Sequence, residues 1–85
     1  MTTESLRETY ETLKSWEDTQ WISLALVAEI AGCTPEELAA AVTQALADED
    51  FRAEPQPHRH RLTDEDRRHA VTIGGEPRHL ICWAG

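Results

Sequence analysis

The chain has 85 residues, 40% of them hydrophobic, and a formal net charge of −8 at pH 7, which favours one small domain and opposes nonspecific binding to duplex DNA. Residues 1–50 hold 2 basic and 11 acidic residues, whereas residues 51–85 hold 6 basic and 5 acidic ones together with all four histidines. No apolar run approaches the roughly 20 residues that cross a bilayer, and the N-terminus lacks the features of a secretory signal, so we expect a cytoplasmic protein without a membrane contact.

The first predicted helix runs from about Glu4 to Ser15. Its apolar residues recur at the spacing of one helix face, as Leu6, Tyr10 and Leu13. The candidate N-terminal caps are Ser5, which resembles a capping box with Glu8, and alternatively Thr2 or Thr3. A very short strand at Trp21 and Ile22 is expected to follow.

Two helices joined by a three-residue turn form the most informative motif of the chain. Ser23 is expected to cap a helix over about Leu24–Ala31, and Gly32 ends it because the backbone there needs a positive φ angle. Thr34 caps the next helix, which we expect over Pro35–Ala47. The buried stripe of this second helix is expected to comprise Leu38, Ala41, Val42, Ala45 and Leu46.

Short strands and turns are predicted for the rest of the chain. Phe51–Glu54 is typical of a strand, Pro55–Pro57 of a loop, and His58–Leu62 alternates in character and returns as the partner strand. Thr63 is then expected to cap one or two helical turns through His69. The last predicted elements are a hairpin or two short strands, Val71–Ile73 and His79–Trp83, which flank Gly74 and Gly75.

This order of elements resembles a winged helix over Ser23–Arg68, about half of the chain. The residues of the helix-turn-helix that carry the likeness are Ala28, Gly32, Leu38 and Val42. The segment from Ala45 to Asp66, with its arginines and its Leu62-Thr63 pair, is similar to the wing of multiple-antibiotic-resistance-type bacterial regulators. The resemblance implies an α+β fold in one winged-helix-like domain over residues 1–85, with a three-helix core, a small antiparallel sheet or wing, and a C-terminal hairpin or strand.

The second helix of the helix-turn-helix, which reads DNA in many proteins of this shape, contains no Lys or Arg. It carries the same sign of charge as nucleic acid, so we interpret the chain as a non-enzymatic domain for protein–protein interaction or regulatory adaptation. The candidate contacts for an unknown protein partner are Glu36, Glu37, Ala40, Gln44 and Trp83. Trp16, Trp21 and Trp83 are expected either to pack in the core or to serve as exposed anchors, and Trp83 is the best candidate for an anchor.

The alternative function is that of a small DNA-binding transcriptional regulator that contacts the DNA backbone through an arginine-rich wing, as a dimer. Its candidate contacts, for which we favour charge balance or an acidic protein partner over DNA, are Arg52, Arg59, Arg61, Arg67 and Arg68. These arginines could also only balance the acidic half of the same molecule, including in a head-to-tail homodimer. The strand that ends in Trp83 could likewise pair with a second subunit.

Metal-binding and catalytic motifs are not recognised in the sequence. His58 and His60 are expected on one strand face, whereas His79 and Cys82 stand three residues apart and so face opposite sides of a strand. This spacing does not predict a zinc site, and we expect no cofactor. Cys33 and Cys82 are expected to be free thiols. The chain has no nucleophile elbow and no phosphate-binding glycine loop, so we do not expect an enzyme.

Overall fold

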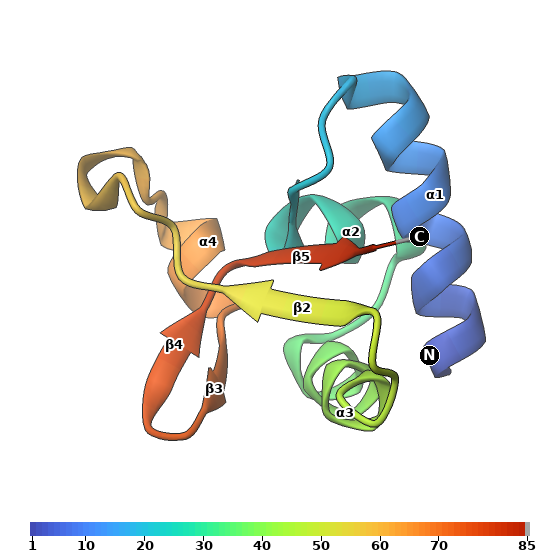
Figure 1. Cartoon of the computed structure of the whole chain (residues 1–85). Coiled ribbons are helices and arrows are strands. Elements are labelled where there is room, and N and C mark those ends of the chain that lie inside the picture. The colour runs from blue at the N-terminus through green and yellow to red at the C-terminus, as the bar shows by residue number, and fades with distance from the viewer. Residues whose placement is uncertain (85) are drawn as a thin grey trace.

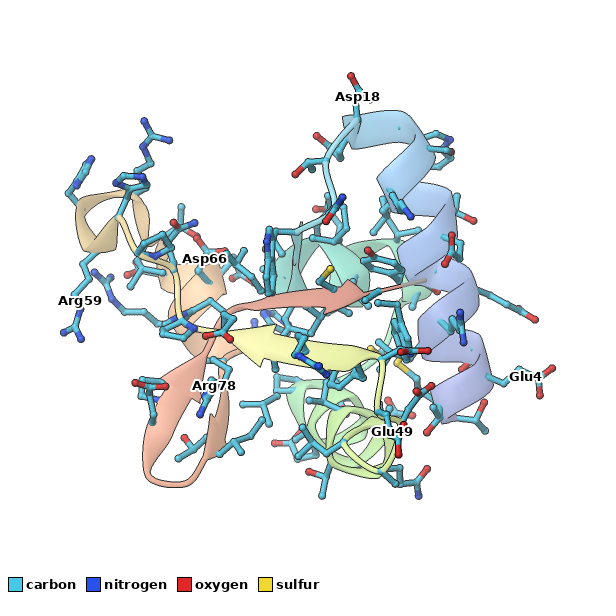
Figure 2. All side chains as sticks on the ribbon, viewed as in Figure 1. Glu4, Asp18, Glu49, Arg59, Asp66 and Arg78 are labelled. Atoms are coloured by element: carbon cyan, nitrogen blue, oxygen red, sulfur yellow. The ribbon has the colours of Figure 1, made fainter. Side chains whose placement is uncertain are left out.

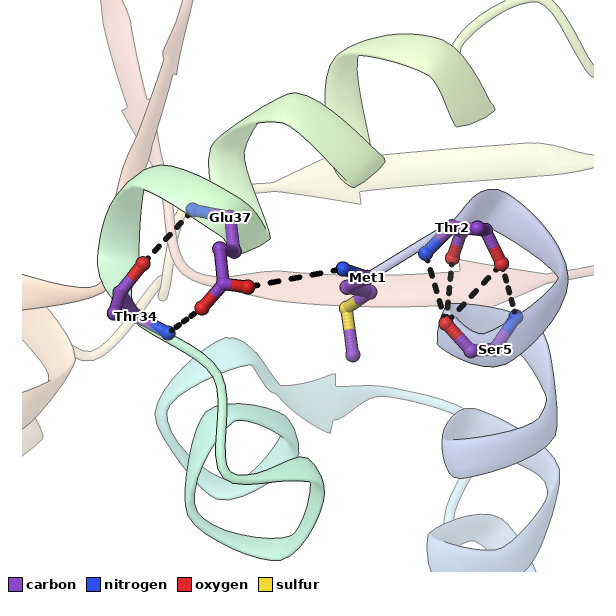
Figure 3. A network of polar contacts seen from close by, with 5 residues as sticks. All are labelled: Met1, Thr2, Ser5, Thr34 and Glu37. Carbon is purple, nitrogen blue, oxygen red and sulfur yellow. Dashed lines mark hydrogen bonds and ion pairs between the residues drawn. The ribbon is translucent and has the colours of Figure 1, made fainter.

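The computed structural model describes residues 1–84 (Figure 1). Local capping motifs determine where its first helices begin. Helix α1 (Thr3–Glu17) is capped by Thr2, whose side chain accepts a hydrogen bond from the Ser5 backbone N–H at 3.1 Å while Ser5 Oγ accepts one from the Thr2 N–H at 2.9 Å (Figure 3). The capping box expected at Ser5 and Glu8 is therefore wrong, because Ser5 already serves as the third residue of the helix, and the alternative cap Thr2 is confirmed.

The helix-turn-helix forms as its sequence predicts. Ser23 caps α2 (Leu24–Ala31), and Gly32 ends it in the left-handed conformation with a φ of 69°. Helix α3 (Pro35–Ala45) begins with a second capping box, in which Thr34 and Glu37 each accept a hydrogen bond from the other's backbone N–H.

Helix α3 is shorter than expected at its C-terminal end. It ends at Ala45, two residues before the predicted limit, and the chain turns through residues 46–50. Leu38, Ala41, Val42 and Ala45 are buried as predicted. Leu46, which was expected in the same stripe, is 42% exposed because it lies past the last helical turn.

A three-stranded antiparallel sheet lies against these helices. Its strands are β1 (Ile22–Ser23), β2 (Phe51–Glu54) and β5 (Leu80–Trp83), in the order β1-β5-β2. The last strand of the chain is therefore the central one: β2 pairs along its whole length (Figure 1), and β1 pairs with Leu80 and Ile81 on its other edge. The expectation that this strand could pair with a second subunit is wrong for that reason.

The return strand expected at His58–Leu62 is wrong. Strand β2 takes β5 as its antiparallel partner, with Phe51 opposite Trp83, so the segment after Pro57 is not needed for pairing. That segment instead forms a 3₁₀ helix, η1 (Arg59–Arg61), which projects from the body of the molecule beside α4 (Figure 1).

The segment between η1 and β5 contains a helix and a hairpin. Thr63 caps α4 (Asp64–Arg68), which confirms the predicted helical turns. Strands β3 (Val71–Ile73) and β4 (Glu76–Arg78) then pair across the two glycines. The second strand of the final hairpin is thus Glu76–Arg78 and not the segment that begins at His79, whereas the alternative of two short strands is confirmed by β3 and β5. The described chain is an α+β domain with four α-helices and two small antiparallel sheets.

The hydrophobic core joins α1, α2 and α3 to one face of the three-stranded sheet. Its largest fully buried side chains, other than Trp83 at 2% exposure, are Tyr10, Leu6, Leu13, Ile22, Leu24, Leu38 and Ile81. The expectation that Trp16 and Trp21 pack in the core is wrong. Their side chains lie near the α1–β1 connection and are 66% and 38% exposed. Within residues 1–84, none of the helices is both long and apolar enough to span a membrane.

Candidate interaction surfaces

The exposed face of α3 brings three of the predicted contact residues together. Glu36, Ala40 and Gln44 follow one another at intervals of four residues, so they lie on one side of the helix, and all three are exposed. Residues 34–50, which include α3 and the turn after it, contain five acidic residues and no Lys or Arg. This face therefore combines small, uncharged side chains with a negative charge at each end.

Glu37 differs from Glu36 because it also holds the helix start. Its Oε1 accepts a hydrogen bond from the Thr34 N–H at 2.9 Å, and its Oε2 lies 4.0 Å from the amino group of Met1 (Figure 3). The hydrogen bond from the Thr34 backbone lowers the pKa of the Glu37 carboxyl. A change at Glu37 would therefore alter both the cap and the surface charge, whereas a change at Glu36 alters the surface charge and leaves the capping box in place.

The turn between α3 and β2 adds three acidic residues beside two arginines, with Arg7 Nη1 3.9 Å from Asp48 Oδ2, and is connected to the core. Asp48 Oδ1 accepts a hydrogen bond from the Asp50 N–H at 2.9 Å, and Asp48 Oδ2 accepts one from Trp83 Nε1 at 3.1 Å. The backbone N–H of Asp50, followed by the indole of Trp83, lowers the pKa of Asp48. Arg52 Nη1 donates to the carbonyls of Glu49 and Phe51, so Arg52 lies at this turn and not with the other predicted arginines.

Trp83 is not an exposed anchor. Its side chain is 2% exposed, and its ring packs at tilted angles against Phe51 and Tyr10, with centroids 4.6 and 5.5 Å away. The alternative interpretation, that Trp83 packs in the core, is confirmed. The aromatic side chains that remain on the surface are those of Trp16 and Trp21.

The remaining predicted arginines lie on η1 and α4. Arg59 and Arg61 are exposed on η1, and Figure 2 shows Arg59 extending from that projecting segment. On α4, Arg67 Nη1 lies 3.3 Å from Asp64 Oδ1, and Arg68 Nη1 lies 3.7 Å from Glu65 Oε1. Both pairs are solvent-exposed, so they contribute little to stability and leave the guanidinium groups available to other anions.

The free edge of β2 is blocked by arginines. In an antiparallel pair, only alternate residues direct their backbone N–H and C=O groups toward the partner strand. In β2 the backbone groups of Phe51 and Ala53 are directed away from β5, toward the free edge. Their carbonyl oxygens accept hydrogen bonds from Arg52 Nη1 and, at 2.8 Å, from Arg78 Nη1. Occupied acceptors at an edge oppose strand addition by a second chain.

The histidines and cysteines are dispersed. His58 and His60 do not share a strand face, because they belong to the η1 segment, where their ring centroids lie 5.8 Å apart. Both cysteines are free thiols, as expected, and burial raises the pKa of the Cys33 thiol. No group of three or more potential metal ligands occurs among residues 1–84.

His79 is a feature that the sequence did not single out as a buried residue. It lies between β4 and β5, is 7% exposed, and its Nδ1 accepts a hydrogen bond from the Gln56 backbone N–H at 3.0 Å. Burial lowers the pKa of His79, an effect that Asp66 opposes and that Arg59 and Arg67 reinforce. Both the lowered pKa and the role of Nδ1 as an acceptor favour the neutral imidazole with its proton on Nε2.

We expect His79→Asn to reduce the loss of stability on acidification. A histidine whose folded pKa lies below its unfolded value binds a proton more readily when unfolded, so the free energy of unfolding falls as the pH decreases below about 6.5. Asparagine retains an acceptor for the Gln56 N–H but does not titrate. Urea denaturation at several pH values from about 7 to 5 measures the difference, with His58→Asn, on the exposed η1 segment, as the control. An unchanged pH dependence in His79→Asn would contradict the assignment.

Comparison with known proteins found no matching family model, no matching curated protein and no matching solved structure. The side chains and surfaces of this chain are therefore the basis on which its function can be inferred.

Proposed function

We propose that the chain is a winged-helix domain that acts by binding another protein, with the exposed face of α3 as its contact surface. Three features of the topology support the winged-helix assignment: the α2-turn-α3 unit, the short strand before it, and the sheet order β1-β5-β2. In this assignment the segment between β2 and β5 takes the position of the wing. It is enlarged by η1, α4 and the β3–β4 hairpin.

The observation that carries the functional proposal is the charge of the α3 face. A helix that enters a DNA groove needs donors for base edges and cations near the phosphates. Residues 34–50 offer neither Lys nor Arg, and Glu36 lies on the face that would approach the duplex. An acidic face with small side chains such as Ala40 instead suits close approach by a basic surface of a protein partner.

The charges of the β3–β4 hairpin are consistent with this choice. Its single acidic and single basic residue contact each other, with Arg78 Nε 3.1 Å from Glu76 Oε1. The hairpin therefore adds no net positive charge to the enlarged wing. The arginines of η1 and α4 support the alternative function, in which a regulator contacts the DNA backbone through residues such as Arg59 and Arg61.

Charge reversal on α3 tests the proposal. Glu36→Lys is expected to reduce capture of the protein partner by at least about tenfold, because a like charge then faces the basic partner. Glu11→Lys introduces the same charge change at an exposed position of α1 and is the matched control. Glu37 is left unchanged because it completes the α3 cap. The measurement is quantitative affinity capture with the wild type and the two variants.

Duplex binding is measured in parallel. The wild type is expected to leave a random-sequence duplex unshifted in gels at about 150 mM salt. Retardation that weakens as salt rises, and that is lost in the Arg59→Gln, Arg61→Gln double variant, would contradict the proposal and establish the DNA-binding alternative. Equal capture by Glu36→Lys and Glu11→Lys would show that α3 is not the contact surface.

A further inference from the structure

A cavity of about 240 Å³ lies where the β2–η1 loop, α4, β4 and the start of β5 meet. Much of its wall is apolar and comes from Pro55, Leu62, Ala70 and Pro77. Arg59, Arg67 and His79 also line it. Figure 2 shows Arg59 on η1 and Asp66 on α4, the elements on that side of the molecule. The cavity is distinct from the α3 face, so the inference does not depend on the proposed function.

The charged side chains that line this cavity are Arg59, Arg67 and Glu76, with a formal net charge of +1, and the carboxylate of Asp66 acts on His79 from nearby. Within residues 1–84, no ion pair involves Arg59. Arg67 contacts Asp64 at 3.3 Å, but both side chains are exposed, so a ligand can compete for the guanidinium at little cost. Glu76, the acidic residue of the lining, is offset by Arg78 at 3.1 Å.

His79 contributes a neutral polar group to the lining. The Gln56 N–H holds its Nδ1 as an acceptor, so the neutral ring presents an N–H donor at Nε2. Apolar walls with a few donors are typical of small-molecule sites. Two guanidinium groups with planar arrays of N–H donors are suited to a carboxylate.

We propose that this cavity binds a carboxylate attached to a small branched aliphatic group, with Arg59 and Arg67 contacting the carboxylate and the Pro55–Leu62–Pro77 wall contacting the aliphatic group. Two sources share this chemistry: a free short-chain carboxylic acid, and the C-terminal residue of another polypeptide. The small volume excludes a longer segment from the cavity.

Titration with paired probes tests the proposal. N-acetyl-leucine carries both the carboxylate and the branched group, N-acetyl-leucinamide lacks the charge, and acetate lacks the apolar group. We expect N-acetyl-leucine to cause saturable shifts of the Gln56 amide resonance, with millimolar affinity, and the other two to bind at least about tenfold more weakly. Comparison of N-acetyl-leucine with 4-methylpentanoate distinguishes the sources: preference for the former indicates a chain end, and equal binding indicates a free acid.

Arginine variants separate the site from general charge attraction. Arg59→Gln is expected to weaken binding of N-acetyl-leucine about tenfold. Arg61→Gln removes the same charge from η1 but does not line the cavity, so its affinity should match the wild type. Absence of saturation, an equal response to the amide or to acetate, or equal weakening in both variants would each overturn the proposal. Arg59 is exposed, and the amide spectrum of each variant verifies that it remains folded.

Discussion

Replacement of Trp83 by alanine is expected to lower the free energy of unfolding by about 3–5 kcal/mol. The indole is nearly fully buried, packs against Tyr10 and Phe51, and donates its N–H to Asp48. Its removal leaves a cavity beside the central strand and leaves Asp48 Oδ2 without the hydrogen bond from the indole N–H. Because a small domain has only about 5–15 kcal/mol of stability, this change removes a large part of it. Urea denaturation followed by circular dichroism measures the loss.

Two further tryptophan variants make the Trp83 result specific. Trp16→Ala removes the same side chain from an exposed position, so its effect should stay within about 0.5 kcal/mol. Trp83→Phe retains an aromatic ring but loses the hydrogen bond to Asp48, and we expect an intermediate loss of stability. Wild-type stability of Trp83→Ala would contradict the burial of Trp83 in the core.

The helix starts could be predicted because their causes are local. Thr34 and Glu37 are three residues apart, and each satisfies a backbone N–H that the helix leaves free. Gly32 likewise ends α2 through its own φ angle of 69°. Such interactions depend on neighbouring residues alone, so the sequence pattern located them, except at α1, where several adjacent Thr and Ser residues could cap and the first expected box was wrong.

Strand pairing was predicted less well because it depends on distant residues. The strand at Phe51–Glu54 was located correctly, but its partner was expected at His58–Leu62 and is Leu80–Trp83. The expected partner has one apolar residue, Leu62, whereas the true partner buries Ile81 and Trp83 against the helices. Alternation of side chains indicates a strand but does not identify its neighbour, and the energetic gain of burying β5 decided the pairing.

The candidate sites likewise differ in whether they depend on neighbouring or on distant residues. The acidic face of α3 follows from helical spacing, so Glu36, Ala40 and Gln44 could be placed together from the sequence. The cavity beside η1 could not be predicted from the sequence. Arg59 and His79 are twenty positions apart in the chain, and the pairing of β2 with β5 brings them together. The buried state of His79 has no local signal in the sequence, since it depends on the Gln56 loop folding over it.

Leu38→Ala is expected to lower the free energy of unfolding by about 2–5 kcal/mol. Leu38 is fully buried and begins the stripe through which α3 packs against the core. The loss combines the lost burial of the side chain with the cavity left beside α1, which packs directly on α3. Urea denaturation measures it, and a loss below about 1 kcal/mol would contradict the packing of α3 described above.

Ala40→Lys changes the same helix on its opposite face. Ala40 is exposed, and lysine is a good helix former, so this variant should retain stability within about 0.5 kcal/mol. It places a bulky positive charge between Glu36 and Gln44 and should therefore weaken partner capture as Glu36→Lys does. If Ala40→Lys retains its stability but captures less of the partner, the exposed face of α3 contributes to partner binding independently of folding. If Ala40→Lys destabilised the domain as much as Leu38→Ala, the two faces of α3 would not be distinct, and the exposed face could not serve as an independent contact surface.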